Sequence, residues 1–300
     1  MKNTKNAVFA LGIFDGVHRG HQKILRGVSD EAKALQGTPC VYTFNPHPIR
    51  ILSPETPFSL IQTPDQKKRA LEAAGIQICI VEPFTKQLSA LSPEDFFHNQ
   101  IQKQLQPVSI WVGYDFTFGH KRSGTVKTLK KLCAEANIRC HIVEPQYVEE
   151  TLVHSKLIRE QVQRGGVEMA KELLGRPFAL LGTVIRGQGI GGKKLGVHTA
   201  NLSVENELLP GIGVYITQTR TSSGLYPSVT NVGNNPTFEG KGFSIETHIL
   251  NFDQNLKDQK IEVEFLRWLR PEEKFSSAEA LAKVIQNDIL ETERYHGLHA

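Results

Sequence analysis

The chain has few cysteines and no long apolar run, and both absences narrow the kind of protein it is. Only four of its 300 residues are cysteines, and none of them form a CxxC pair. A disulfide framework is therefore not expected, and a chain of this length does not need one to hold its core. No stretch approaches the roughly 20 apolar residues that cross a bilayer. The sequence thus predicts reduced thiols and a cytoplasmic protein without a membrane span.

Runs of like charge are also missing. Lys and Arg number 35 against 31 Asp and Glu, and the net charge is +4. This mild, scattered balance favours anionic small molecules as partners and disfavours a nucleic acid duplex. The N-terminal apolar run ends in Asp15 and lacks a small-residue cleavage site, so a first buried strand is a better interpretation of it than a signal peptide.

The sequence pattern changes along the chain, and the length of the chain favours two domains. Up to about residue 175, short β-rich runs such as VFALGIF, CVYTF and SIWVGYDF alternate with helical patterns. This alternation is typical of an α/β, Rossmann-like, doubly wound parallel sheet, which binds ligands at the carboxyl ends of its strands. Later come glycine-punctuated strands such as IEVEFLRW and one helical pattern near the end, which predict a small antiparallel β-barrel with a C-terminal helix. We expect domains at 1–175 and 179–300.

The stretch FDGVHRGH, residues 14–21, places two histidines where a strand ends and a helix begins. His18 and His21 project from about the same helix face, and the flanking glycines let a ligand approach the backbone. A helix N-terminus adds N–H groups and partial positive charge, which suits phosphate oxygens. Two helix-start histidines without a ligand are the alternative. A zinc site is disfavoured because no third His or Cys has a recognisable spacing.

Two other predicted strands end in polar residues. In TFNPHP, residues 43–48, prolines stop regular pairing and leave Asn45 and His47 facing the carboxyl edge, and GYDFTFG, residues 113–119, offers Asp115. Each signal is weak alone. Because parallel strands end at one edge of the sheet, the three clusters together predict a site there.

A glycine-rich loop lies between two β patterns in the second half, within residues 182–202. Gly187 to Lys194 nearly spells a P-loop, but Lys194 stands where a magnesium-binding Ser or Thr is required, and no helical pattern follows. The remaining interpretations are a loop whose amides wrap a nucleotide phosphate and a plain surface hairpin.

FDGVHRGH resembles the HxGH signature of adenylyltransferases, and its order with TFNPHP, GYDFTFG and LLGRPF resembles the bacterial bifunctional riboflavin kinase and FMN adenylyltransferase family, the FAD synthetases. The resemblance runs along nearly the whole chain. It implies that the N-terminal domain adenylylates FMN to FAD with ATP and Mg²⁺, and that His18 and His21 stabilise the transferred group. The residues implied to bind ATP are Gly12, Phe14, Gly16, Gly20, Asn45, Asp115, Ser155 and Arg159.

The same resemblance assigns the second half to riboflavin phosphorylation. HTAN, residues 198–201, is similar to the element whose Thr and Asn bind magnesium and ATP, which implies Thr199 and Asn201 in that role. SIETH, residues 244–248, is similar to the strand that bears the catalytic base, which implies Glu246. The glycine-rich loop would hold ATP phosphates through Gly187, Gly191 and Lys193.

The sequence departs from the family pattern at several points. His198 replaces a usual proline, and the glycine-rich loop is one residue longer, with Gly192 and Lys193 where an arginine is common. The element VHSKLIR keeps Ser155 and Arg159 but carries His154 and Lys156, and NLKD, residues 255–258, replaces an acidic turn. The rival hypotheses are an enzyme with one degenerate half, a non-catalytic flavin- or nucleotide-binding regulator, and another HxGH adenylyltransferase.

Overall fold

The computed structural model describes residues 5–185, 199–234, 243–273 and 275–298. Its contacts divide the chain into two compact units. The first comprises Met1–Ser59 and Pro64–Ser155, and the second comprises Leu60–Thr63 and Lys156–Ala300.

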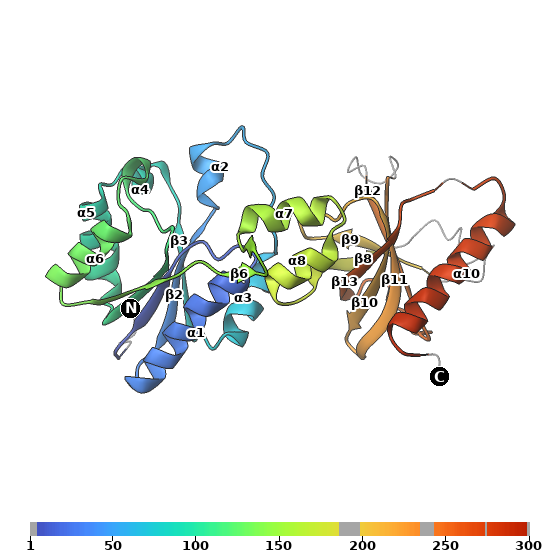
Figure 1. Ribbon diagram of the computed structural model, residues 1–300, viewed down its shortest axis with the longest axis horizontal. Helices are drawn as coiled ribbons and strands as arrows, with labels where there is room; N and C mark the ends of the chain where they lie inside the picture. Colours follow the sequence, from blue (N-terminus) through green and yellow to red (C-terminus); the bar gives the residue numbers. More distant parts are fainter. Residues whose placement is uncertain (1–4, 186–198, 235–242, 274, 299–300) are drawn as a thin grey trace. The chain divides into compact units, whose positions relative to one another are not determined.

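A five-stranded parallel sheet forms the centre of the first unit (Figure 1). The order is β3-β2-β1-β4-β5, and every neighbouring pair is parallel. The chain runs from β1 outward to β3 and then returns to the other side of β1, so the sheet has a switch point between β1 and β4. The strands are β1 (Val8–Leu11), β2 (Pro39–Asn45), β3 (Ile78–Pro83), β4 (Ser109–Gly113) and β5 (Arg139–Val143).

The helices of this unit follow the strands as the alternating pattern predicts. They are α1 (Arg19–Ala34), α2 (Pro48–Leu52), α3 (Pro64–Ala73), α4 (Lys86–Ser89), α5 (Pro93–Phe96) and α6 (Val126–Glu135). α5 continues into a π-helix, η1 (Phe97–Leu105), and a 3₁₀ turn, η2 (His120–Arg122), precedes α6. A two-stranded ribbon of β6 (Tyr147–Val148) and β7 (Thr151–Leu152) leads to α7 (Ser155–Gln163).

Both faces of the sheet are covered, because alternate residues of each strand point to opposite sides. Phe9 and Leu11 of β1 belong to a core shared with η1 and α6, whereas Val8 and Ala10 belong to a core shared with α1 and α3. Burial on both sides explains why β1 reads as an uninterrupted apolar run. The predicted three-layer α/β domain is confirmed.

The second unit contains a closed antiparallel barrel of order β10-β11-β12-β9-β8-β13. Its strands are β8 (Phe178–Ile185), β9 (Ala200–Val204), β10 (Gly213–Thr221), β11 (Gly224–Asn234), β12 (Phe243–Ile249) and β13 (Lys260–Arg270). α8 (Val167–Leu174) packs against β8 and β13, and α10 (Ala278–Tyr295) packs against β10 and β11. The predicted barrel with its C-terminal helix is confirmed.

The interior of the barrel contains a network of hydroxyl groups. Thr217 hydrogen-bonds through Oγ1 to the Ser228 Oγ at 2.7 Å and to the Thr230 Oγ1 at 2.8 Å, and Thr230 donates to Thr247 Oγ1 at 2.9 Å. All four residues are fully buried. Each hydroxyl group has a partner, so hydrogen bonds within the network replace those that the groups lose to water on burial.

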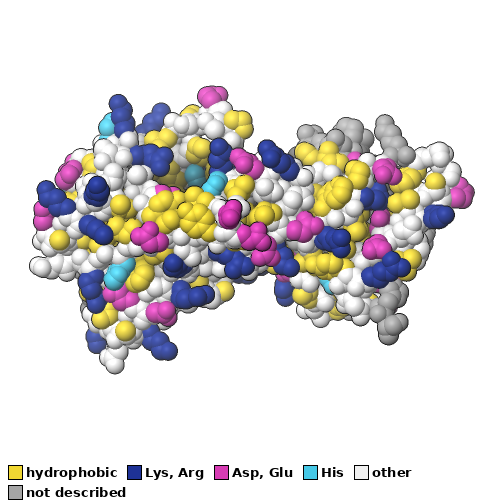
Figure 2. Space-filling view, in the orientation of Figure 1, with side chains coloured by type: hydrophobic (Ala, Val, Ile, Leu, Met, Phe, Trp, Pro, Cys, Tyr) yellow, Lys and Arg dark blue, Asp and Glu magenta, His cyan; other side chains and the backbone are white. Residues whose placement is uncertain are grey.

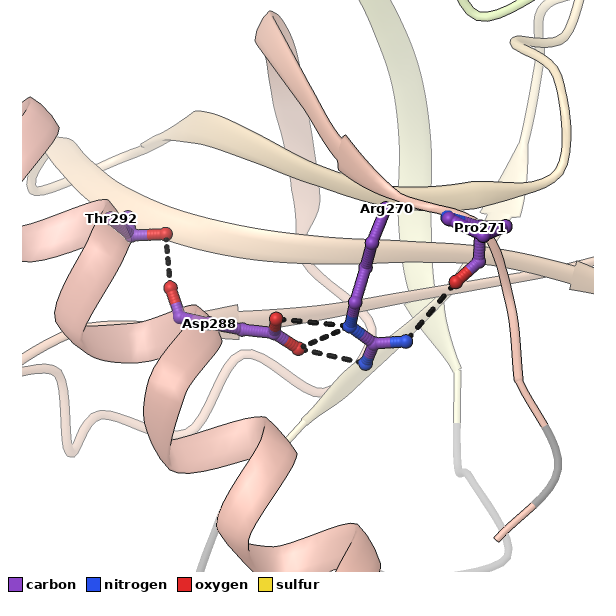
Figure 3. Close-up of polar contacts among 4 residues, drawn as sticks. All are labelled: Arg270, Pro271, Asp288 and Thr292. Carbon is purple, nitrogen blue, oxygen red and sulfur yellow. Dashed lines mark hydrogen bonds and ion pairs between the residues drawn. The ribbon is translucent and has the colours of Figure 1, made fainter.

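A buried ion pair fastens α10 to the end of β13 (Figure 3). Arg270 donates from Nε to Asp288 Oδ1 at 3.0 Å and from Nη2 to Oδ2 at 2.8 Å, and its Nη1 donates to the carbonyl of Pro271 at 3.1 Å. At the N-terminus of α10, the Ser277 side chain caps the helix by accepting a hydrogen bond from the backbone N–H of Ala280. This cap satisfies one of the free backbone N–H groups in the first turn of the helix.

Candidate active sites

The turn between β1 and α1 has an unusual backbone. Phe14, Gly16 and Val17 have φ of 53°, 84° and 41°. Glycine tolerates such values, but the other two residues pay roughly 1–2 kcal/mol each for them. Phe14 is fully buried and its ring lies over Gly12, where an added Cβ would come within 3.1 Å of it. Strain of this kind persists only where surrounding contacts hold it, and it is concentrated at functional sites.

His18 and His21 lie together at the start of α1. Their rings are stacked, with centroids 3.6 Å apart and an interplanar angle of 15°, and Phe14 meets His21 edge-on at 5.1 Å. His18 is the N-cap, and its Nδ1 accepts the backbone N–H of His21 at 3.3 Å. An accepting Nδ1 carries no proton, so the neutral ring holds its proton on Nε2 and donates from there. Gly20 packs closely beside it, since an added Cβ would make a tight contact of 3.2 Å with the His18 ring.

Side chains from β2, α3, α7 and α1 itself hold the carbonyl groups of this turn. Lys67 Nζ and Thr43 Oγ1 donate to the carbonyl of Ile13 at 2.6 and 3.0 Å. Ser155 Oγ donates to the carbonyl of Asp15 at 3.0 Å, and Gln22 Nε2 donates to that of Val17 at 2.9 Å. The turn is therefore fixed at alternate peptides: residues distant in the sequence hold the Ile13 and Asp15 carbonyls, and Gln22 of α1 holds that of Val17.

The sheet brings the predicted polar strand ends to one edge. Asn45 is the last residue of β2 and Asp115 follows β4, so both lie at the carboxyl ends of the strands that flank β1. Asp115 is exposed, and its Oδ1 would lie 3.1 Å from a Cβ on Gly113. His47 instead caps the short helix α2, where its Nδ1 accepts the N–H of Ile49. The His18 turn lies at this same edge, at the switch point where doubly wound sheets bind their ligands.

The remaining predicted residues fall elsewhere. Arg159 lies on α7 in the second unit, four residues after Ser155. Gly187, Gly191, Lys193 and the departure His198 lie outside the described residues. Their assignments therefore stay predictions.

In the barrel, three predicted residues come together: Asn201 on β9, Thr199 directly before β9, and Glu246 on the neighbouring strand β12. Asn201 of β9 pairs directly with Glu246 of β12, and the Thr199 side chain hydrogen-bonds to the Glu246 carboxylate. Burial raises the pKa of Glu246, the bond from Thr199 lowers it, and the nearby Glu272 raises it further. Hydroxyl and amide oxygens beside a carboxylate are hard ligands that suit Mg²⁺ with ATP phosphates.

Two charged residues beside these sites are not predicted from the sequence. Lys67 on α3 lies half-buried beneath the His18 turn, one helical turn before the buried Leu71, and that i, i+4 spacing is the signal that marks its inward face. Glu272 follows β13, and an added Cβ on Gly233 would lie 2.5 Å from its Oε1. No pattern in the sequence marks Glu272, because only the closure of the barrel brings it there.

Groups of three or more His, Cys, Asp and Glu with metal-site geometry do not occur among the described residues.

No helix in the described part of the chain has the length and apolar character needed to span a membrane. On the face drawn in Figure 2, basic and acidic side chains are interspersed over the coloured surface.

A doubly wound sheet with a polar site at its switch point, joined to a barrel that presents a carboxylate beside Thr and Asn, defines a two-domain transferase that handles nucleotide phosphates. The model of the FAD synthetase family matches residues 1–157, and that of riboflavin kinase matches residues 174–296. The chain belongs to the family of bifunctional riboflavin kinase/FMN adenylyltransferases, and both halves of the family are present.

Curated relatives support this assignment over nearly the full length. The bifunctional riboflavin kinase/FMN adenylyltransferase of Bacillus subtilis is 34% identical, with 96% of this chain and 92% of the relative covered. The Escherichia coli K12 protein of the same name is 28% identical, with 98% and 94% covered. A solved structure from Streptococcus pneumoniae, titled a macrolide-efflux protein, is 30% identical with a TM-score of 0.89, covering 97% of this chain and 95% of that one. The whole two-domain fold is therefore shared.

Proposed function

We propose that the two reactions of the family are carried out at the two sites described above, one in each domain. The observation that carries this assignment is the stacked pair His18 and His21 at the N-terminus of α1, at the carboxyl edge of a parallel sheet. The proposed domains are 1–175 for adenylyl transfer and 179–300 for riboflavin phosphorylation.

In the first domain, a phosphate oxygen of FMN attacks the α-phosphorus of ATP, and pyrophosphate leaves without a covalent enzyme intermediate. The nucleophile is already an anion, so the reaction needs donors rather than a base. His18 donates from Nε2 and His21 lies against it, and both stabilise charge that develops on the phosphoryl oxygens. Asn45, Asp115, Ser155 and Arg159 are proposed to position ATP or its metal ion.

In the second domain, the 5′-hydroxyl of riboflavin attacks the γ-phosphorus of ATP, and ADP leaves. This nucleophile carries a proton, which Glu246 accepts. A carboxylate suits the role because phosphoryl transfer needs its nucleophile oriented more than it needs a strong base. Thr199 and Asn201 would hold Mg²⁺, which supplies charge neutralisation for the ATP phosphates when it is bound. Gly187, Gly191 and Lys193 are proposed to contact those phosphates.

The test is to incubate the purified protein with riboflavin, ATP and Mg²⁺ and to separate the flavins by chromatography. We expect FMN first and FAD later. His21→Ala should stop the reaction at FMN, whereas Glu246→Gln should block FMN formation but leave the conversion of added FMN to FAD intact. Undiminished FAD formation by His21→Ala would refute the assignment of the first site.

The finer hypotheses are tested separately. An enzyme with one degenerate half, for example the kinase half with His198, would fail one step when each is assayed alone. A non-catalytic flavin-binding regulator would bind flavin tightly and turn over neither substrate. A cytoplasmic location and the absence of a nucleic acid partner stay predictions from the cysteine usage and the charge balance.

A further inference from the structure

Lys67 is a cation of the first unit to which the chemistry above gives no task. It lies on α3, between β2 and β3 in the chain, and its side chain reaches the carboxyl ends of β1 and β2. The neighbouring Lys68 is different: its side chain is 72% exposed, and its ion pair is a 3.9 Å contact with Glu72 on the same helix. The two lysines therefore have the same sequence context but opposite surroundings.

The Lys67 ammonium closes a triangle of hydrogen bonds. Its Nζ donates to the carbonyl of Ile13 at 2.6 Å and to Thr43 Oγ1 at 2.9 Å, and Thr43 Oγ1 donates to the same carbonyl at 3.0 Å. Thr43 is fully buried. Burial lowers the pKa of Lys67, while Cys79 and Asp15 act in the opposite direction. Hydrogen bonds from a charged donor are about twice as strong as neutral ones, and the bond from Lys67 to the Ile13 carbonyl is of this kind.

The carbonyl that Lys67 holds belongs to the residue directly before the strained turn. Phe14 and Val17 keep positive φ only while outside contacts fix the peptides around them. The carbonyls of Asp15 and Val17 are held by the neutral donors Ser155 and Gln22. Among the anchors described for this turn, Lys67 is the charged one.

We propose that Lys67 is a positioning residue for adenylyl transfer: by holding the Ile13 carbonyl, it fixes the turn that delivers His18 and His21 to the transferred phosphoryl group. The inference rests on the proposed assignment of those histidines. It gives Lys67 no contact with the substrate. Its effect is exerted through the backbone, and because the histidines act on charge that develops in the transition state, it falls on kcat more than on the KM for ATP.

The experiment compares Lys67→Met, Lys67→Arg and the matched control Lys68→Met in the full-length chain. FAD formation from FMN and FMN formation from riboflavin are assayed separately, and Tm is recorded for each variant. Lys67→Met should lower kcat for FAD formation about 10- to 100-fold, the range for loss of a hydrogen bond to a charged group. KM for ATP and the riboflavin kinase rate should stay within about twofold, Lys67→Arg should recover most of the lost rate, and Lys68→Met should behave as the wild type.

A wild-type kcat in folded Lys67→Met overturns the inference, and so does a loss that Lys67→Arg does not relieve. If Lys67→Met fails to fold, Lys67→Gln takes its place, because its shorter, neutral side chain cannot form the charged bond to the Ile13 carbonyl; a wild-type kcat there also overturns the inference. His21→Ala is run in parallel. If it leaves FAD formation intact, the site assignment itself is wrong, whereas an inactive His21→Ala beside a fully active Lys67→Met refutes only the role of Lys67.

Discussion

Removing the carboxylate of Asp288 should destabilise the barrel unit measurably. Three N–H···O contacts join Arg270 to Asp288: Nε donates to Oδ1 at 3.0 Å and to Oδ2 at 3.2 Å, and Nη2 donates to Oδ2 at 2.8 Å. The Asp288 and Arg270 side chains are only 10% and 20% exposed. Asp288→Ala leaves the guanidinium largely buried without its counter-ion. Breaking a fully buried pair in this way costs about 3–5 kcal/mol, and partial exposure of Arg270 reduces the expected loss to about 2–3 kcal/mol. At ~2–4 °C per kcal/mol, Tm should fall by roughly 5–10 °C.

The chain offers both a local probe and a matched control for this measurement. Its two tryptophans are Trp111 in the first unit and Trp268 in the second, so in a Trp111→Phe background the fluorescence during urea unfolding reports on the barrel unit. Glu291 forms an ion pair with Arg294 on the same helix, but these side chains are 52% and 65% exposed, and Glu291→Ala should cost at most ~1 kcal/mol.

The double variant Arg270→Met with Asp288→Leu separates the charge from the packing. Because it removes both ions, it should recover much of the stability that Asp288→Ala loses. The reasoning is refuted if Asp288→Ala is no less stable than Glu291→Ala, or if the double variant loses as much as the sum of its single substitutions.

Three further results are expected. Glu246 must be ionised to accept a proton, and burial and Glu272 raise its pKa, so kcat/KM for riboflavin should rise with pH through a pKa above the ordinary value of a glutamate. Glu272→Gln should move this rise to lower pH. Because the folded state binds the proton of Glu246 more tightly than the unfolded state, the stability of the fold should decrease as the pH rises through the same range. Gly27→Ala should destabilise the first unit by about 1–3 kcal/mol in urea unfolding, although alanine is the better helix former, because its Cβ would meet the Trp111 ring at 2.2 Å; a more stable variant would contradict this. Lys156→Ala should raise the KM for ATP in FAD formation roughly two- to fivefold, as expected for an 82% exposed cation; an unchanged KM would rule out its role.

The parts of the fold that were predictable depend on local rules. Alternating strand and helix patterns predict a parallel sheet, and the ends of its strands must meet at one edge. For that reason Asn45, Asp115 and the His18 turn were expected together and are found at one edge. Glu246 and Asn201 were expected in one site only through the family resemblance, and the barrel pairs them directly.

The parts that were not predictable depend on contacts between distant segments. Ser155 reaches the carbonyl of Asp15 across 140 residues, and Lys67 reaches Ile13 across 54. No spacing encodes such pairs, because tertiary packing decides which polar groups meet. The hydroxyl network around Thr217 is similar: serines and threonines in a strand usually mark its wet face, and here they fill the barrel interior.

The two proposed sites differ in whether they offer hydrogen-bond donors or a proton acceptor, and this difference matches the nucleophile of each reaction. A phosphate monoester attacks as an anion, so the first site needs hydrogen-bond donors. The His18 turn supplies imidazole N–H groups and a helix N-terminus, and the Lys67 ammonium group holds the Ile13 carbonyl before this turn. A primary alcohol attacks only as its proton leaves, so the second site needs an acceptor, and burial beside Glu272 makes Glu246 a better one by raising its pKa. Each proposed site therefore has the protonation chemistry that the other lacks. For that reason a carboxylate at the position of His21, or an imidazolium at that of Glu246, would oppose the step that its own domain performs.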